Sequence, residues 1–308
     1  MLPALIRSNI EQIAADNVHG ASVLTSEAAG MFALLAEEDV PEEGLHGLLV
    51  EASLALIAAQ PSMASIFRLA NDALLAAEAS QGPSELRRRL TRFSEEARVR
   101  MERVAARVAQ QGAELVQDGA VVMTHSHSTA VERALCQARK KGKRFRVLAA
   151  ESRPLREGLA LARSLARAGI PIALFADAAV YRMMPEATVV MVGADAVSSQ
   201  GLVNKIGTAP AALAARELGK PLFAICGSDK FLGPRMRTVA ERPRAARELL
   251  PETPPGVAAL NYYFDTTPLS LVSGVVTEDG VLSGDGLAGR LSQLRAHPAL
   301  LKLQDQMS

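Results

Sequence analysis

The chain has 308 residues, of which 49% are hydrophobic and 22% are charged, a balance typical of globular proteins. Its formal net charge of +1 gives no general reason to expect a nucleic acid or an anionic membrane as a partner. Two cysteines are too few for a disulfide framework, which favours the reducing cytoplasm. Glu11 and Asp16 interrupt the apolar core that a signal peptide would need, and no apolar run is long enough to span a membrane.

The first third of the chain has the composition and spacing of helices, because Ala, Leu, Glu and Arg dominate and apolar residues recur every three or four positions. The expected helices cover 3–16, 25–37, 42–58, 61–79 and 84–115. The last of these carries arginines from Arg87 to Arg107, interleaved with Glu95, Glu96 and Glu102. We interpret it as a solvated amphipathic helix with i,i+4 ion pairs, and nucleic-acid binding is the less favoured alternative.

The pattern changes near residue 119, where short apolar runs begin to alternate with helical stretches. The apolar runs are 120–123, 145–149, 172–175, 189–192, 222–226 and 271–276, and the helical stretches are 128–141, 157–168, 178–184 and 208–218. Alternating runs of this kind are typical of βαβ units. The sequence therefore predicts an α/β fold in which helices cover both faces of a parallel sheet.

Polar residues follow each of the first five apolar runs. They are 124–128 after the first, 151–154 after the second, Asp177 after the third, Asp195 with 204–208 after the fourth, and 228–230 after the fifth. Ligands of open parallel sheets bind beyond the carboxyl ends of the strands. These side chains are therefore the candidates for a binding site along one edge of the sheet.

The segment 204–208 (Asn-Lys-Ile-Gly-Thr) opens one of the expected helices. Gly207 allows the backbone to approach an anion, and Thr208 can cap the helix. Free amides at that helix start, with Lys205 beside them, would form a phosphate site. A plain capped helix with a surface lysine is an equally good interpretation.

Asp195 follows an apolar run and a Gly-Ala pair, so its carboxylate is a candidate general acid or base. The alternative is that it caps the following turn. His125 and His127 point in opposite directions if the preceding strand continues, so only one of them would face the site. No His, Cys and Asp spacing elsewhere indicates a metal, and we expect neither a metal nor another cofactor.

Ser126 lies between two histidines but lacks the glycine pattern of a hydrolase nucleophile, so a serine hydrolase is not favoured. Cys136 and Cys226 lie within expected elements, where packing is a better interpretation than nucleophilic chemistry.

Several of these segments, taken in order, resemble the initiation factor 2B alpha/beta/delta family, which includes methylthioribose-1-phosphate isomerase and ribose-1,5-bisphosphate isomerase. The segments are 124–128 (Thr-His-Ser-His-Ser), 151–154 (Glu-Ser-Arg-Pro), 177–180 (Asp-Ala-Ala-Val), 193–197 (Gly-Ala-Asp-Ala-Val), 204–208, 229–231 (Asp-Lys-Phe), 264–268 (Phe-Asp-Thr-Thr-Pro) and 277–280 (Thr-Glu-Asp-Gly). The resemblance covers about 115–283, and the preceding residues agree mainly in helical character.

This resemblance implies a helical domain, which we assign to 1–114, and a Rossmann-like domain over 115–308 through which a homodimer forms. It also implies binding of a sugar phosphate. The isomerases of the family interconvert an aldose 1-phosphate and its ketose with a cysteine and an aspartate. Asp195 matches the aspartate, and Asn204 and Lys205 match positions that contact the sugar and its phosphate.

The chain departs from the isomerase pattern at several positions. Ser126 stands where the cysteine is expected, His127 where asparagine is usual, and Glu157 where glutamine is expected. Segments 19–21 (His-Gly-Ala) and 60–62 (Gln-Pro-Ser) stand where arginine motifs bind substrate. A serine hydroxyl has a far higher pKa than a thiol, and neither His nor Gln reproduces the bidentate phosphate contact of Arg.

Together these observations predict a set of site residues. The candidate catalytic residues are Asp195, Ser126, His125 and His127, and the candidate substrate-binding residues are Gly20, Ala21, Arg153, Glu157, Asn204, Lys205, Gly207, Thr208 and Lys230.

Two functions remain open. One is a cytoplasmic, dimeric aldose–ketose isomerase in which Asp195 moves a proton and His125 or His127 replaces the thiol. The other is a non-catalytic regulatory subunit with a protein partner, which senses a sugar phosphate or a nucleotide. The second resembles the alpha subunit of initiation factor 2B, which also lacks the cysteine.

Overall fold

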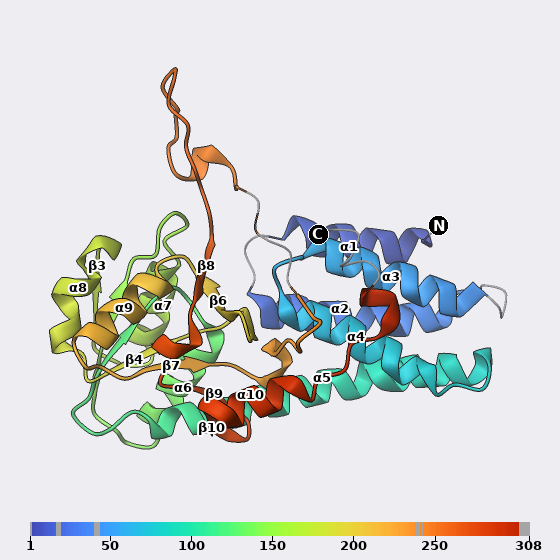
Figure 1. Ribbon diagram of the computed structural model, residues 1–308, viewed down its shortest axis with the longest axis horizontal. Coiled ribbons are helices and arrows are strands. Elements are labelled where there is room, and N and C mark those ends of the chain that lie inside the picture. The colour runs from blue at the N-terminus through green and yellow to red at the C-terminus, as the bar shows by residue number, and fades with distance from the viewer. Residues whose placement is uncertain (1, 17–19, 40–43, 238–240, 242, 302–308) are drawn as a thin grey trace. The chain divides into compact units, whose positions relative to one another are not determined.

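The structure, a computed structural model, describes residues 2–16, 20–39, 44–237, 241 and 243–301 (Figure 1). The chain divides into two compact units. The helical unit comprises Met1–Arg103, Asp229–Ala240 and Leu291–Ser308, and the sheet unit comprises Val104–Ser228 and Glu241–Arg290.

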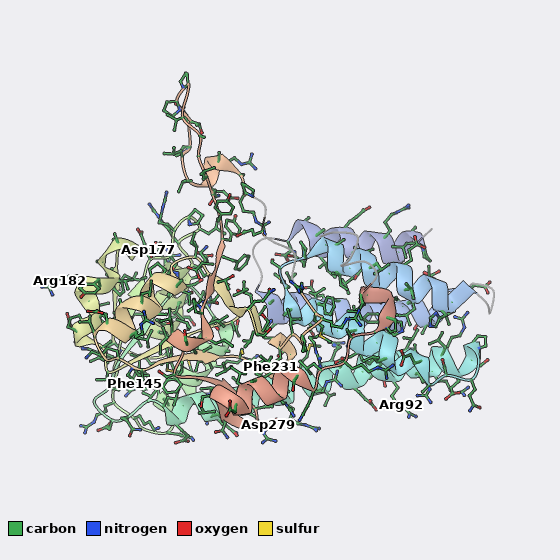
Figure 2. All side chains as sticks on the ribbon, viewed as in Figure 1. Arg92, Phe145, Asp177, Arg182, Phe231 and Asp279 are labelled. Carbon is green, nitrogen blue, oxygen red and sulfur yellow. The ribbon has the colours of Figure 1, made fainter. Side chains whose placement is uncertain are left out.

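This division differs from the two consecutive segments, 1–114 and 115–308, that we expected from the sequence, because two later segments return to the helical unit. Lys230 Nζ donates a hydrogen bond of 2.9 Å to Ser65 Oγ, and His297 N donates one of 2.8 Å to Asn71 Oδ1. Phe231, labelled in Figure 2, is completely buried. These contacts lie far apart in sequence, so local periodicity carries no sign of them.

The helical unit contains the helices α1 (Ala4–Ala15), α2 (Ala21–Glu37), α3 (Leu45–Ala59) and α4 (Ala64–Glu78), together with the first part of α5 (Pro83–Glu114). The helices predicted from the apolar spacing are confirmed to within a few residues. Phe32 of α2 and Phe93 of α5 meet edge to face, with ring centroids 5.6 Å apart. Arg92 is exposed on α5 and points outward in Figure 2, as expected for the solvated side of an amphipathic helix.

The described part of the sheet unit contains a seven-stranded sheet in the order β10-β9-β7-β4-β1-β2-β3. Its strands are β1 (Val121–Thr124), β2 (Arg146–Ala150), β3 (Ile172–Phe175), β4 (Val189–Val192), β7 (Leu222–Ile225), β9 (Gly274–Thr277) and β10 (Gly280–Leu282). All neighbours pair in parallel except β9 and β10. The predicted α/β class and the mostly parallel sheet are confirmed.

The connecting helices are α6 (Thr129–Lys140), α7 (Glu157–Arg167), the one-turn α8 (Val180–Met183), α9 (Thr208–Glu217) and α10 (Gly284–Ser292). Leu135 of α6 and Leu161 of α7 share a buried core with Val122 of β1 and Val147 of β2. The chain passes from β1 outward to β2 and β3 and then returns to place β4 on the other side of β1. The direction of winding therefore reverses between β1 and β4, which is where open α/β sheets bind ligands.

A second, antiparallel sheet in the order β5-β6-β8 was not expected from the sequence. Its strands are β5 (Ala196–Ser198), β6 (Gly201–Lys205) and β8 (Phe264–Thr267). Asn204 pairs with Asp265, and Lys205 pairs with Phe264. The expectation that Asn204 and Lys205 lie in a loop after a strand is therefore wrong, because both belong to β6.

Candidate functional site

His125 follows β1 and is buried, with only 4% of its surface exposed. Its Nε2 lies 2.6 Å from the carbonyl oxygen of Ile206, and its Nδ1 lies 3.3 Å from Ser152 Oγ. A carbonyl can only accept a hydrogen bond, so Nε2 carries the hydrogen. Burial lowers the pKa of His125 from its ordinary value, which favours the neutral imidazole. The two ring nitrogens of His125 therefore link the loop after β1 to Ile206 and to Ser152.

Ser126 adopts a left-handed conformation with a φ of 64°. β1 ends at Thr124, so the alternating strand that would have separated His125 from His127 does not continue. The Ser126 N–H donates a hydrogen bond of 2.7 Å to Ser152 Oγ. Ser152 is itself completely buried and has a φ of 67°. Such conformations in residues other than glycine are concentrated at functional sites.

Asp177, after β3, holds the loop that follows β2. Its Oδ1 accepts a hydrogen bond of 2.7 Å from the N–H of Ser152, and its Oδ2 accepts one of 2.7 Å from the N–H of Arg153. The Arg153 guanidinium donates to the carbonyl oxygen of Leu249 at 3.0 Å. The ends of β1, β2 and β3 are thus connected through Ser126, Ser152 and Asp177.

His127 points toward α6. Its Nε2 lies 2.6 Å from Glu132 Oε2, and this contact is the main cause of the lowered pKa of the Glu132 carboxyl. Ser128 caps the same helix, since its Oγ accepts a hydrogen bond of 3.4 Å from the N–H of Val131. The imidazole of His127 is therefore engaged with a helix of the same unit.

Asp195 lies half-buried at the point where the chain leaves β4 and enters the antiparallel sheet. Its N–H donates a hydrogen bond of 2.9 Å to the carbonyl oxygen of Val203 on β6. A Cβ on the nearby Gly193 would lie 2.7 Å from Ser128 Oγ and 3.4 Å from Asn204 Oδ1. The loops after β1 and β4 and the strand β6 therefore pack directly together at the switch point.

The amides at the start of α9 are not free, contrary to the expectation from the sequence. Asp265 Oδ2 accepts hydrogen bonds from the N–H groups of Gly207 at 2.8 Å and Ala209 at 3.2 Å. Burial raises the pKa of the Asp265 carboxyl, although these amide hydrogen bonds act in the opposite direction. Thr208 is buried, and its Oγ1 donates to the carbonyl oxygen of Lys205 at 2.6 Å and accepts from Asn204 Nδ2 at 2.9 Å. A carboxylate of the chain thus occupies the expected phosphate position.

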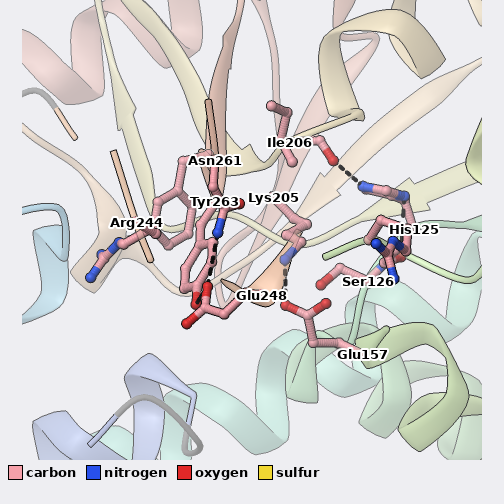
Figure 3. Close-up of polar contacts among 12 residues, drawn as sticks. His125, Ser126, Glu157, Lys205, Ile206, Arg244, Glu248, Asn261 and Tyr263 are labelled. Atoms are coloured by element: carbon pink, nitrogen blue, oxygen red, sulfur yellow. Dashed lines mark hydrogen bonds and ion pairs between the residues drawn. The ribbon is translucent and has the colours of Figure 1, made fainter. Parts of the chain in front are cut away.

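Lys205 is almost fully buried and forms an ion pair with Glu157, the first residue of α7 (Figure 3). Lys205 Nζ lies 2.6 Å from Glu157 Oε1 and 4.9 Å from the centroid of the Tyr263 ring. The guanidinium of Arg244 also lies 4.9 Å from that centroid. Both residues were expected from the resemblance to bind substrate, and the sequence did not indicate that they pair with each other.

Tyr263 belongs to a group that sequence reasoning missed. Its hydroxyl donates to Glu248 Oε2 at 2.5 Å, and burial is the main cause of the raised pKa of this phenol. Asn261 Nδ2 donates to the same oxygen at 2.9 Å. These residues flank a loop over 250–260 that extends away from the sheet before β8 (Figure 1). The only signal in the sequence was the aromatic run that ends at Phe264.

The remaining predicted site residues lie in the helical unit. Gly20 is exposed and precedes α2, which begins at Ala21. Lys230 Nζ is bonded to Ser65 Oγ, which lies 2.7 Å from Thr25 Oγ1. Thr25 in turn donates to the carbonyl oxygen of Ala21 at 2.6 Å. Lys230 is thus connected to the start of α2 through two hydroxyl groups.

The positions where the family resemblance implied arginines carry no guanidinium. Gln60 is buried and donates a hydrogen bond of 2.8 Å to the carbonyl oxygen of Ile13, so it connects α1 to the end of α3. His19 lies outside the described residues.

The described ranges contain neither a cluster of metal-binding side chains nor a helix suited to a membrane. No group of three or more His, Cys, Asp and Glu side chains there could hold a metal ion. Within the same ranges, no helix combines the length and apolar character that crossing a membrane requires. Cys136 is half-buried and Cys226 is buried.

Comparison with known proteins supports the family resemblance that the ordered motifs indicate. A family model described as the initiation factor 2 subunit family matches residues 17–284. A putative translation initiation factor eIF-2B subunit 2-like protein of Pyrococcus furiosus is 32% identical over 92% of this chain and 98% of its own length. The ribose 1,5-bisphosphate isomerase of Archaeoglobus fulgidus is 31% identical over 88% of each chain.

A solved structure gives the same result for the fold. The translation initiation factor eIF-2B of Pyrococcus horikoshii OT3 superposes with a TM-score of 0.79 and 32% identity, over 91% of this chain and 98% of that one. The match from residue 17 onward extends the resemblance through the helical unit, which the motifs alone did not cover.

Proposed function

Because this chain belongs to the initiation factor 2 subunit family, we propose that it binds a sugar phosphate and converts an aldose 1-phosphate into its ketose. The observation that carries this proposal is the position of Asp195. Asp195 lies just after the end of β4, next to the switch point. Its N–H donates a hydrogen bond to the carbonyl oxygen of Val203, the residue before Asn204 on β6. The similarity to an archaeal ribose 1,5-bisphosphate isomerase along most of both chains supports the same reaction class.

In the proposed reaction the bond between C1 and the ring oxygen breaks with its electron pair on the oxygen, and the hydrogen on C2 moves to C1 as a hydride. A carboxyl group at Asp195 donates a proton to the ring oxygen as the ring opens. It then accepts a proton from the 2-hydroxyl group as the C2 carbonyl forms. Asn204 lies on β6 and is held by Thr208 at the start of α9, and it orients the sugar through its side-chain amide.

We assign His125 a positioning role within this proposal. Its Nε2 hydrogen is bonded to Ile206 and its Nδ1 faces Ser152, so neither nitrogen is directed at a ligand. The hydroxyl of Ser126 serves as a hydrogen-bond partner, since a serine hydroxyl supplies a proton far less readily than a thiol. His127 remains a candidate acid or base only if its contact with Glu132 opens.

The second candidate function is a non-catalytic regulatory subunit that senses a sugar phosphate or a nucleotide. Two observations favour it. Relatives named for translation initiation factor eIF-2B match nearly the whole chain, and Ser126 stands where the isomerases carry a cysteine. In this case ligand binding would alter contacts with a protein partner without chemical conversion.

One experiment separates the two candidates. Pentose and hexose 1-phosphates are incubated with the protein, and ketose formation is followed by NMR, while thermal unfolding with the same ligands reports binding. Conversion supports the isomerase. A raised unfolding temperature without conversion, together with a specific partner in pull-downs, supports the regulatory subunit. We also propose that the protein is cytoplasmic and forms a homodimer. Light scattering of the purified protein tests the dimer.

A further inference from the structure

The hydroxyl of Ser152 joins the loop after β2 to the loop after β1. Ser152 is completely buried, and its Oγ accepts a hydrogen bond of 2.7 Å from the N–H of Ser126. The N–H of Ser152 donates in turn to Asp177 Oδ1 at 2.7 Å. Two hydrogen bonds in series therefore fix the backbone of Ser126 to a carboxylate that follows β3.

The single hydrogen of the Ser152 hydroxyl has two acceptors within reach. The carbonyl oxygen of Ala150 lies 3.1 Å from Ser152 Oγ, and Nδ1 of His125 lies 3.3 Å from it. Nδ1 can only accept, because Nε2 carries the hydrogen of the neutral imidazole. A hydroxyl oxygen has two lone pairs, so neither choice requires Oγ to release the N–H of Ser126.

Both serines have left-handed backbones, with a φ of 64° at Ser126 and 67° at Ser152. This conformation costs free energy in any residue except glycine, and it persists only where surrounding contacts hold it. In the view of Figure 3, the Ser126 hydroxyl points toward the side of the site where Lys205 and Glu157 meet. The bond from Ser126 to Ser152 therefore keeps a costly conformation at a position that faces the site.

From this arrangement we propose that Ser152 is a positioning residue, which holds Ser126 in its ligand-binding conformation before the ligand arrives. The inference rests on the proposed function, because it takes the Ser126 hydroxyl as a hydrogen-bond partner of the sugar phosphate. Ser152 is completely buried, so it acts through Ser126 and does not touch the ligand. The conformational entropy of the loop after β1 is then lost on folding and not on binding, which favours affinity.

Two substitutions separate this role from a purely structural one. Ser152→Ala removes the hydroxyl and keeps the strained backbone, whereas Ser152→Gly removes the hydroxyl and relieves the strain. Calorimetry with ribose 1-phosphate gives the dissociation constants, and urea unfolding gives the stabilities. We expect both variants to bind about tenfold more weakly than the wild type, because the loop must now be ordered on binding. Ser152→Gly should be the more stable variant, so affinity should not follow stability.

Ser273→Ala is the matched control. Ser273 Oγ accepts a hydrogen bond of 3.1 Å from the N–H of Leu222, the first residue of β7. The same kind of bond is therefore lost at the amino end of a strand, on the edge of the sheet opposite the candidate site. This variant should bind ribose 1-phosphate as tightly as the wild type.

Hydrogen exchange of the wild type tests the inference without any substitution, and so remains decisive if a variant folds poorly. The amide hydrogen of Ser126 should exchange slowly in the ligand-free protein, as expected for an N–H bonded to a buried hydroxyl. Rapid exchange that becomes slow only when ribose 1-phosphate is added would show that the loop is ordered by the ligand and not by Ser152.

The outcomes distinguish this inference from the proposed function. If ribose 1-phosphate binds the wild type and both Ser152 variants equally, if affinity follows stability, or if the Ser126 amide is protected only by the ligand, the positioning role is overturned and the proposed function stands. If ribose 1-phosphate does not bind the wild type, sugar-phosphate binding itself is overturned and the inference falls with it.

Discussion

The imidazole of His125 lies directly against the Cα atom of Gly207. A Cβ added at Gly207 would be 2.8 Å from Nε2 of His125 and 2.9 Å from its Cε1, closer than real Cβ atoms come. Gly207 also has a φ of 104°, a conformation that costs free energy in any other residue. The loop after β1 and the start of α9 therefore meet at a position where only glycine fits.

Substitution Gly207→Ala should destabilise the protein more than the same change at Gly219. Both glycines have a positive φ, but a Cβ at Gly219 would have no atom within 4 Å. Gly219→Ala therefore measures backbone strain alone, about 1–2 kcal/mol. Gly207→Ala should cost a further ~1–3 kcal/mol through the collision with His125. Urea unfolding of the two variants checks this, and equal losses would show that the collision is absent.

The buried imidazole of His125 predicts a pH dependence of stability. Burial lowers its pKa below the ordinary 6.5, so the unfolded chain binds a proton at a higher pH than the folded protein does. The free energy of unfolding therefore falls as the pH falls below 6.5 toward the folded pKa. His125→Gln removes this contribution, so its stability deficit relative to the wild type should narrow on acidification.

Urea unfolding of both proteins between about pH 7.5 and pH 5 measures this deficit. His297, whose pKa burial also lowers, is present in both proteins, so its contribution cancels in the difference. A deficit that stays constant across the range would mean that His125 is not desolvated in the folded protein.

The parallel sheet could be predicted because short apolar runs alternate with helical patterns from β1 to β7. β3 and β4 have the predicted bounds. The antiparallel sheet could not be predicted, because β5 has only three residues and β6 pairs with β8, whose residues lie about sixty positions later. Pairing across that separation leaves no periodic signal near Asn204.

Residues of the candidate site could be named from the sequence, but the contacts between their side chains could not. Lys205 and Glu157 both carried functional expectations, yet their ion pair joins β6 to α7. Gly207 was expected to let an anion approach the backbone, and the carboxylate bonded to its amide in the structure is Asp265 of the chain itself. Contacts of this kind depend on the tertiary fold. The sequence therefore could not show that the amides at the start of α9 already have a partner in Asp265.

Restoring a thiol after β1 tests whether the rest of the site can support isomerisation. Ser126→Cys introduces a group with an ordinary pKa near 8.5 in the same left-handed backbone position. We expect kcat/KM for a sugar 1-phosphate to rise by about 100-fold, the lower end of the usual contribution of acid–base catalysis. Ser283→Cys, at an exposed position before α10, is the matched control. No rise in the first variant would argue against a retained isomerase site.

The most direct test of the central claim is the conversion of a sugar 1-phosphate by the wild type and by Asp195→Asn, followed by NMR. We predict that the wild type forms the ketose and that the variant binds the same ligand with a similar affinity while kcat falls about 10²–10⁴-fold. The contrary result is a ligand that binds both proteins equally and is converted by neither. That outcome would contradict catalysis at Asp195 and identify the chain as a sensor of sugar phosphates.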